Sequence, residues 1–126
     1  SSKIDFKLDI SEKAVFSSLN TQLFGWVIEN IMRNAIDALQ GKGEIKVAIK
    51  EHSKNVIIDI SDNGKGIKSS QLKTVFEPGY TTKLRGWGLG LSLVKRIVED
   101  YHKGQVYILH SELGKGSTFR ISLLKS

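Results

Sequence analysis

The order of apolar and polar positions divides the chain into strands and helices. Over Ile4–Ile10 the two kinds of residue alternate, which predicts a half-buried strand. Over Leu23–Leu39 apolar residues recur every three or four positions, which predicts an amphipathic helix, and Asn20 precedes it as a candidate N-cap. The same spacing over Leu91–Tyr101 predicts a second helix that ends near Gly104.

Four further segments have the composition of strands and form two predicted hairpins. Glu44–His52 and Asn55–Ser61 flank the two turn residues Ser53-Lys54, and Gln105–His110 and Ser117–Leu124 flank a glycine-containing turn. The strands of a hairpin are antiparallel, so most of the sheet should be antiparallel.

Between the hairpins the pattern is weaker. A short helix is predicted around Ser70–Val75, and a loop over Phe76–Gly88, which contains the only proline. Helices that are separated from a largely antiparallel set of strands predict an α/β fold of two layers. We expect a sandwich with a mixed, mostly antiparallel sheet of about five strands, covered on one face by about three helices.

Length and composition limit the functions to consider. The 126 residues suit a single domain over residues 1–126, and the absence of cysteine excludes disulfides and thiolate metal sites. The net charge of +6 is scattered and not interleaved with aromatic residues, so nucleic acid is a weak candidate partner. No apolar run approaches the roughly 18–20 residues that cross a bilayer, and no signal pattern opens the chain, so we expect a soluble segment without membrane insertion.

Three polar residues share one face of the first predicted helix. Asn30, Asn34 and Asp37 are spaced by four and three positions, beside the apolar stripe. For any one of them alone, a solvated polar face is the favoured interpretation. Two asparagines four positions apart weaken it, because asparagine is a mediocre helix former and its amide oxygen can bind Mg²⁺.

Glycine clusters follow that helix. Asp62 ends a strongly apolar strand and is followed by Gly64 and Gly66, and a second cluster, Gly86–Leu91, leads directly into the second helix. A carboxylate at the inner end of a strand needs a donor, such as the exocyclic amine of adenine. Backbone amides at a loop-to-helix junction favour phosphate. A simple Asp-Asn-Gly turn and a flexible loop are the competing interpretations for each feature by itself. Neither a P-loop nor a dinucleotide-binding motif is present.

The order of these motifs resembles the ATP-binding catalytic domain of sensor histidine kinases, within the GHKL group that includes gyrase, the Hsp90 chaperones and the MutL proteins. The resemblance covers roughly residues 4–124 and implies a Bergerat-type fold. It rests on five segments in the order of the family's motifs, namely Glu29–Ala35, Asp62–Ile67, Phe76–Lys83, Gly86–Leu91 and Gly114–Phe119.

The resemblance also implies roles for individual residues. Asn34 would coordinate a Mg²⁺ ion on the phosphates of ATP, with Asn30 beside them, and Asp62 would accept the adenine amine with Ser117 close by. Gly64, Gly66 and Ile67 would shape the base pocket, and Gly79–Arg85 would form a lid over the phosphates. Further nucleotide contacts are implied for Tyr80, Thr81, Thr82, Lys83, Arg85, Gly86, Trp87, Gly88, Leu89, Gly90 and Leu91.

Three positions depart from the family pattern. Asp37 stands where many histidine kinases carry lysine, so a metal or water contact would replace a phosphate contact. Gly79 replaces a common aromatic residue and should loosen the start of the lid. Trp87 replaces a common Thr or Ser, and we expect it to pack against the lid or a partner helix, with core packing as the alternative for it and for Trp26.

The leading hypothesis is a histidine kinase domain that transfers the γ-phosphate of ATP to a histidine. The acceptor would lie on a dimerisation domain outside this chain, in a homodimeric cytoplasmic or membrane-anchored bacterial sensor with a downstream response regulator. A hydrolytic ATPase of the group is expected to carry a glutamate base where Asn30 stands, and one helical step rotates Glu29 about 100° away from that stripe. A related serine kinase and a non-catalytic nucleotide-binding module are two further hypotheses.

Overall fold

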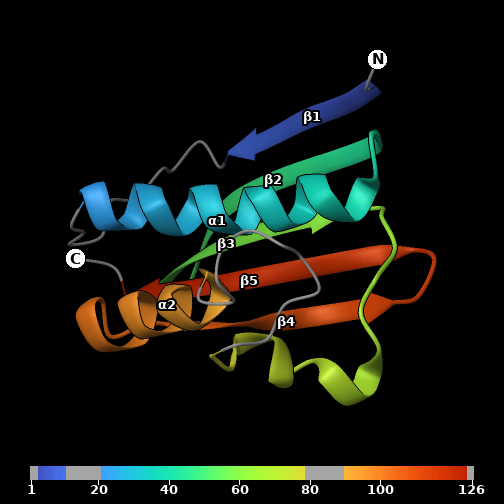
Figure 1. The fold of residues 1–126 in the computed structure, drawn as a ribbon. Coiled ribbons are helices and arrows are strands. Elements are labelled where there is room, and N and C mark those ends of the chain that lie inside the picture. The colour runs from blue at the N-terminus through green and yellow to red at the C-terminus, as the bar shows by residue number, and fades with distance from the viewer. Residues whose placement is uncertain (1–2, 11–20, 79–89, 125–126) are drawn as a thin grey trace.

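The computed structural model describes residues 3–10, 21–78 and 90–124. Their strands form one five-stranded sheet in the order β1-β2-β3-β5-β4, with β3 in the centre (Figure 1). Strand β1 runs parallel to β2 and the other neighbours are antiparallel, so the predicted mixed, mostly antiparallel sheet is confirmed. The strands are β1 (Lys3–Ile10), β2 (Lys42–His52), β3 (Asn55–Asp62), β4 (Gln105–Glu112) and β5 (Gly116–Leu124).

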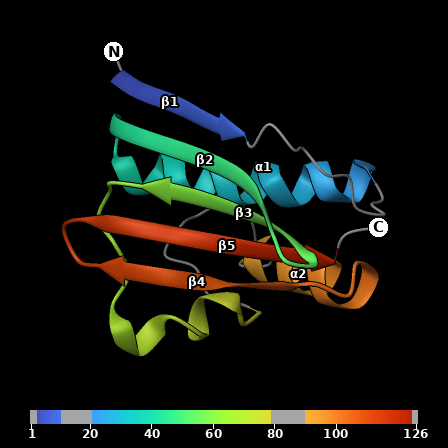
Figure 2. The ribbon, with the colours of Figure 1, turned by 180° about the vertical axis from the view of Figure 1, so that it is seen from behind.

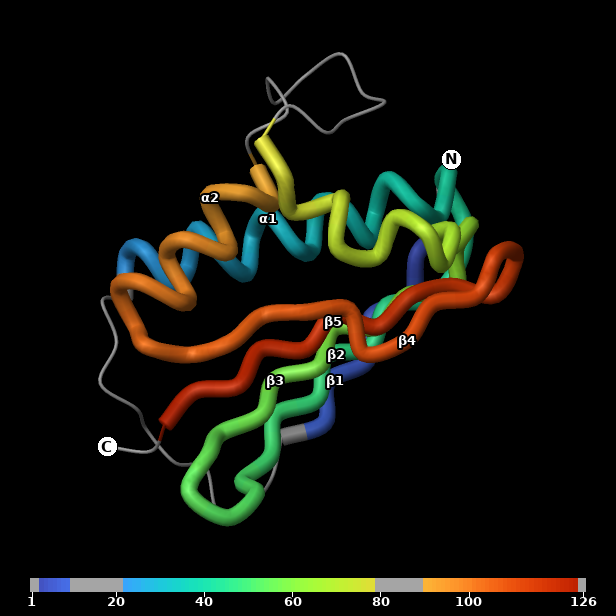
Figure 3. The backbone as a smooth tube through the Cα atoms, turned by 90° about the horizontal axis from the view of Figure 1, so that it is seen from below, coloured from blue at the N-terminus to red at the C-terminus, as the bar shows by residue number. Residues whose placement is uncertain are grey.

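The helices lie on one face of this sheet. Figure 2 shows the sheet in front of the helices, and the end-on view of Figure 3 shows the two layers. Helix α1 (Thr21–Leu39) is the longest, and α2 (Gly90–Arg96) continues as the π-helical turn η3 (Ile97–Tyr101). Two 3₁₀ turns, η1 (Ser69–Gln71) and η2 (Thr74–Phe76), complete the layer among the described residues. The predicted two-layer sandwich is confirmed.

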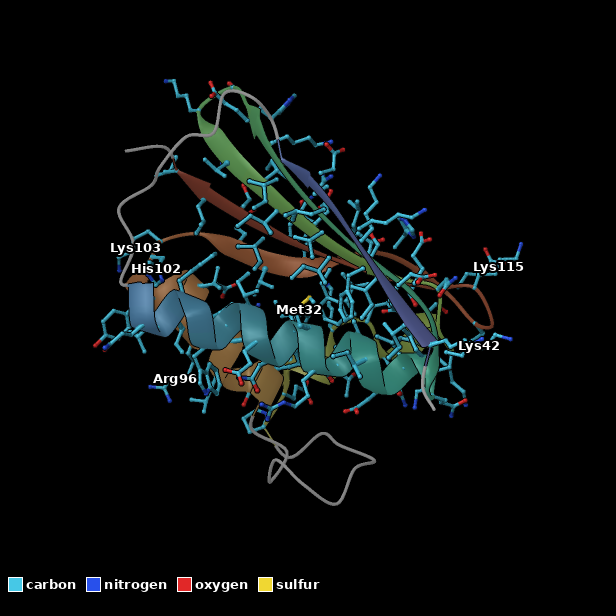
Figure 4. All side chains as sticks on the ribbon, turned by 90° about the horizontal axis from the view of Figure 1, so that it is seen from above. Met32, Lys42, Arg96, His102, Lys103 and Lys115 are labelled. Carbon is cyan, nitrogen blue, oxygen red and sulfur yellow. The ribbon has the colours of Figure 1, made fainter. Side chains whose placement is uncertain are left out.

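The core lies between α1 and the three central strands. Val27, Ile31, Ala35 and Leu39 recur every fourth position of α1 and are buried, as the apolar stripe predicted. Met32 also points from α1 toward the sheet (Figure 4). The sheet contributes Ile45, Ile58, Ile60, Phe119 and Ile121 to the same core, α2 contributes Val94, and η3 contributes Val98.

Some predicted boundaries differ from the structure. The single short helix predicted over Ser70–Val75 is wrong, because the segment forms the separate turns η1 and η2. Strand β2 begins two residues earlier than predicted, because Lys42 and Gly43 pair with β1, and β3 extends to Asp62, which pairs with Ile45. Strand β4 continues to Glu112 instead of ending at His110. The candidate cap Asn20 lies outside the described residues, as does most of the loop predicted over Phe76–Gly88.

Two turns connect α1 with β2 and β2 with β3. The predicted hairpin turn is confirmed, because His52 pairs with Asn55 and Ser53 adopts a positive φ of 58°. Helix α1 ends where Gln40 and Gly41 both adopt positive φ, as a glycine-type C-cap does. Within the described ranges, none of the helices combines the length and apolar character that a bilayer crossing requires.

Candidate nucleotide-binding site

Asp62 is the last residue of the central strand and its side chain is largely enclosed. The residue is 9% exposed. Its Oδ1 accepts the N–H of Gly64 at 2.9 Å, and the backbone N–H of Ser117 also donates to the carboxylate. Burial raises the pKa of Asp62 above its ordinary value, and the two N–H donors partly offset this effect. No lysine or arginine in the described ranges forms an ion pair with it, so the carboxylate keeps acceptor capacity for a further donor.

A pair of serine hydroxyls lies beside that carboxylate. Ser117 is opposite Asp62 in the β3–β5 register and is 4% exposed, so the two residues lie close together, as the resemblance implied. The Ser117 Oγ is 2.7 Å from the Ser111 Oγ, which also accepts the N–H of Ile67 at 2.8 Å. These bonds connect the end of β4, the end of β5 and the loop after β3 into one polar cluster.

Sequence reasoning missed Ser111. The predicted strand stopped at His110, and an unbroken ladder from the Ile108–Phe119 pair would place His110 opposite Ser117. A bulge between Ile108 and His110 shifts the register, so that Ser111 faces Ser117 instead. A β-bulge has no reliable signature in alternating sequence, and therefore no pattern in the chain could have identified this residue.

The glycines after Asp62 are required by the protein's own backbone. A Cβ on Gly64 would overlap the carbonyl of Ala38 at the end of α1, and Gly66 has φ of +77° and faces the carbonyl of Glu112. The Lys65 N–H donates to the Ala38 carbonyl at 3.1 Å. The loop is therefore held between α1 and the β4–β5 turn, at the end of the molecule where Figure 4 labels Lys42 and Lys115. The contribution of these glycines to a base pocket stays a prediction.

The two asparagines of α1 have a defined amide orientation. The Asn30 Nδ2 donates to the Trp26 carbonyl at 2.8 Å, and the Asn34 Nδ2 donates to the Asn30 carbonyl at 2.9 Å. A carbonyl can pair only with a donor, so each amide oxygen points away from these bonds. A Cβ built on Gly90, the first residue of α2, would be 3.3 Å from the Asn30 Oδ1. The start of the second helix thus lies beside the asparagine stripe.

Glu29 and Asp37 complete this part of α1. Continuous helix from Thr21 to Leu39 places Asp37 on the face of the asparagines, as predicted. Glu29 is exposed, and its Oε1 accepts the Arg33 Nη2 at 3.0 Å. The glutamate is therefore on another face of the helix, in a surface ion pair. Trp26 is partly buried and packs against the core, which confirms the packing alternative for this tryptophan.

The two groups of polar residues are joined by α1. Gly90 meets the helix at Asn30, and Gly64 meets it at Ala38. These two contacts are about 12 Å apart along the axis, given the rise per residue of an α-helix. The carboxylate cluster therefore lies near the C-terminal end of α1, and the contact with α2 lies near its middle.

The remaining predicted residues divide into described and undescribed ones. Ile67 and Leu91 pack against the core, and Phe76 is buried with its ring edge-on to Phe119 at 6.1 Å between centroids. The predicted lid and most of the second glycine cluster lie outside the described residues, so their nucleotide contacts stay predictions. They are Gly79, Tyr80, Thr81, Thr82, Lys83, Arg85, Gly86, Trp87, Gly88 and Leu89.

The side chains of the site suit a magnesium ion only in part. No group of three His, Cys, Asp or Glu residues that could enclose a metal exists in the described ranges. Asn30, Asn34 and Asp37 place amide and carboxylate oxygens on one face of α1. Mg²⁺ prefers oxygen ligands and commonly takes the rest of its shell from phosphates and water. The donor set therefore fits an ion brought in with a nucleotide and not a resident metal centre.

The mixed sheet with its single helix layer places the chain in the class of two-layer α/β sandwich domains. The family model described as histidine kinase-, DNA gyrase B- and HSP90-like ATPase matches residues 20–126. The chain belongs to this family.

Individual relatives are sensor histidine kinases. Over 97 residues, 77% of this chain, it is 44% identical to the sensor histidine kinase ZraS of Escherichia coli strain K12, and it spans 20% of that protein. The catalytic domain of the histidine kinase ThkA superposes with a TM-score of 0.86 at 28% identity, covering 97% of this chain and 79% of that one. ThkA in complex with the response regulator TrrA matches 98% of this chain and 34% of that one, with a TM-score of 0.83 and 26% identity. The chain is thus a histidine kinase catalytic domain of the ATP-binding kind.

Proposed function

We propose that this domain binds Mg-ATP and donates the γ-phosphate to a histidine on a separate dimerisation domain. The observation that carries the proposal is the buried Asp62 carboxylate, which two backbone N–H groups hold and no cation of the described ranges neutralises. A charged acceptor of this kind, enclosed at the end of the central strand, suits the exocyclic amine of adenine. Such a bond contributes about 1.5–3 kcal/mol.

The two contacts along α1 indicate how a bound nucleotide would be oriented. The base would lie at Asp62 and Ser117, beside the C-terminal end of the helix, and the phosphates would lie toward Asn30 and Gly90. The separation of about 12 Å along the helix leaves room for a ribose and phosphates between the two contacts. The undescribed segment of residues 79–89, with Lys83 and Arg85, would supply positive charge at the phosphate end.

Asn34 would hold the metal through its Oδ1, with Asp37 on the same face as a further oxygen ligand, directly or through water. When bound, Mg²⁺ supplies positive charge that neutralises the phosphate oxygens. The protein contributes position: the amide of Asn34 is fixed by its bond to the Asn30 carbonyl, so its oxygen is held in one direction.

Transfer is favoured over hydrolysis by the residues around Asn30. Attack by water needs a proton acceptor, and a carboxamide is not one. The nearest glutamate, Glu29, is exposed and bonded to Arg33 on another face of α1. Phosphoryl transfer to a histidine depends mainly on positioning and charge neutralisation, which this site would supply.

The partners follow from the class of relatives. ThkA has been crystallised in complex with the response regulator TrrA, which supports a response regulator as the downstream partner of the full protein. The chain spans a fifth of ZraS, so the dimerisation and sensor parts would lie outside it. We infer a homodimeric bacterial sensor whose catalytic domain meets ATP and the regulator in the cytoplasm.

Two measurements test this proposal. The first is a titration of the chain with a non-hydrolysable ATP analogue, with and without Mg²⁺; tighter binding with the ion is expected. The second mixes the chain, ATP and a dimerisation domain of the same protein, where acid-labile phosphate on that domain is expected. Acid-stable phosphate would show a serine or threonine kinase. Rapid ATP turnover by the chain alone, abolished in Glu29→Gln, would show a hydrolytic ATPase.

A further inference from the structure

Ser111 makes three polar contacts at the candidate base site. Its Oγ accepts the N–H of Ile67 at 2.8 Å, is 2.7 Å from the Ser117 Oγ, and is 3.2 Å from the Gly116 carbonyl oxygen. It is the only side chain in the described ranges that bonds both to the loop after Asp62 and to the Ser117 hydroxyl. Its position depends on the bulge in β4, which puts it opposite Ser117.

The hydrogen count of a serine hydroxyl limits how these bonds can be arranged. Ser111 has one hydrogen to donate and two acceptor positions, and the Ile67 N–H occupies one of them. If Ser111 donates to the Gly116 carbonyl, Ser117 must donate to Ser111 and keeps only acceptor capacity. If Ser111 donates to Ser117, the Ser117 hydrogen is available to a ligand. The Ser111–Ser117 bond of 2.7 Å is present in both arrangements, but the Gly116 contact of 3.2 Å is longer than the roughly 2.5–3.0 Å of an O–H···O bond, which favours the second arrangement.

The two arrangements present different patterns of hydrogen-bond donors and acceptors to a purine base. On its Watson–Crick edge adenine has an amine donor at N6 next to an acceptor at N1, whereas guanine has an acceptor at O6 next to a donor at N1. Asp62 is an acceptor when ionised. With Ser117 as a direct donor to N1, the two residues match adenine. With Ser117 as an acceptor, direct contact with N1 would place two acceptors together.

We propose that Ser111 is a positioning residue for nucleotide selection, because it directs the Ser117 hydroxyl hydrogen toward the base and fixes the Ile67 amide beside it. This inference rests on the proposed function and deepens it. Ser111 acts through Ser117 and touches neither the phosphates nor the acceptor histidine. Its removal should therefore change the choice between adenine and guanine nucleotides without preventing phosphate binding.

The test compares Ser111→Ala, Ser111→Thr and Ser111→Cys with a control, Ser61→Ala. Ser61 joins the same two strands through a 2.9 Å bond to the Thr118 Oγ, but on the opposite face of the sheet. The dissociation constants of non-hydrolysable ATP and GTP analogues and the unfolding midpoint are measured for each. In Ser111→Ala the preference for ATP over GTP should fall about fivefold, the size of one neutral hydrogen bond. Ser111→Thr should keep the preference, Ser111→Cys should lie between, and Ser61→Ala should match the parent.

A double-mutant cycle identifies the path of the effect. If Ser111 acts through Ser117, then Ser111→Ala should change selectivity little in a Ser117→Ala background. Hydrogen exchange of the Ile67 amide provides a readout without nucleotide, and should be faster in Ser111→Ala but not in Ser61→Ala. Equal weakening of ATP and GTP in Ser111→Ala, with a lower unfolding midpoint, would show a structural role and overturn the inference. A parent that prefers ATP while Ser111→Ala keeps the same preference would also overturn it, and leave the proposed function intact. A parent that binds neither nucleotide would overturn both.

Discussion

The two aspartates of strand β3 face opposite sides of the sheet and have different hydrogen-bond partners. Asp59 faces the side of the sheet away from the helices, and its two oxygens accept the Nε and Nη2 of Arg120 on β5, both at 2.7 Å. Asp62 faces the helix layer and has only backbone N–H donors among the bonds of the described residues. The paired carboxylate helps raise the pKa of the Arg120 guanidinium, whereas burial raises the pKa of the Asp62 carboxyl itself.

The difference separates a structural carboxylate from a binding carboxylate. A bidentate arginine satisfies Asp59 in geometry and charge, and little is left for a ligand. Asp62 is buried at a cost that the fold alone does not recover, because desolvation penalises its charge. Helix α1 repeats the contrast, since Glu29 is paired with Arg33 while the amide oxygen of Asn30 lies beside the start of α2.

The largest effect should come from Asp62→Asn. An amide oxygen can still accept the Gly64 and Ser117 N–H groups, so the folded chain should be as stable as the parent or more so. The affinity for ATP should nevertheless fall about 10–100-fold, because a charge-assisted bond is lost. Selection of adenine over guanine should fall with it. Calorimetric titration and thermal unfolding measure the two effects, and binding of both nucleotides as in the parent would show that Asp62 does not hold the base.

Arg120→Met should have the reverse effect, lowering the stability of the fold without changing the affinity for ATP. The change leaves the Asp59 carboxylate without its arginine partner. The side chains of Arg120 and Asp59 are 23% and 15% exposed, so solvent screens part of the lost interaction energy. We expect the free energy of unfolding to drop by about 1–3 kcal/mol, with ATP affinity unchanged. Urea unfolding measures the drop. The double variant Asp59→Asn/Arg120→Met should recover part of it, and a loss of ATP affinity in either variant would remove the distinction between the two aspartates.

Asn34→Ala should affect only the metal-dependent part of binding. The affinity for ATP in Mg²⁺ should fall about tenfold, the loss of one strong polar contact, while the affinity in EDTA should stay at the parent value. Titrations in the two buffers give both values. An equal loss in both would place Asn34 at the nucleotide instead of at the ion.

The raised pKa of Asp62 predicts two pH dependences. Protonation removes the charged acceptor, so ATP affinity should fall as the pH is lowered through this pKa, at a higher pH than for an exposed carboxyl. Between the ordinary pKa of the unfolded chain and the raised pKa of the folded chain, the folded state binds more protons. The free energy of unfolding should therefore decrease as the pH rises through that window. Asp62→Asn should lack both trends, and parent-like trends in that variant would assign them to another group.

The smallest effect should come from Glu29→Gln. Its ion pair with Arg33 is exposed and spans one helical turn, so stability should change by no more than about 0.5 kcal/mol. ATP turnover and phosphotransfer should equal those of the parent in a coupled assay. A loss of turnover would make Glu29 a base and bring the domain closer to the hydrolytic members of its family.

The local sequence pattern was sufficient to predict the main helices and strands and to place Asn30, Asn34 and Asp62 on them. The apolar spacing of Val27, Ile31 and Ala35 required one buried face of a helix, and that helix necessarily placed Asn30 and Asn34 on a common stripe. The apolar run of β3 likewise placed Asp62 at a strand end. These features depend on the periods of helix and strand, which neighbouring residues set by themselves.

Pairing between strands that are distant in the sequence decided which side chains bond to one another, and the sequence alone could not predict these partners. Asp59 finds Arg120 only because β5 inserts between β3 and β4, and Ser111 reaches Ser117 only because a bulge shifts the β4–β5 register by one residue. The 3₁₀ turns η1 and η2 on either side of Leu72 also pack against the core, so their form depends on tertiary contacts more than on local helical pattern. The chain by itself therefore determined which residues each element offers, and the folded sheet determined their partners, because strand order and register join residues that are far apart along the backbone.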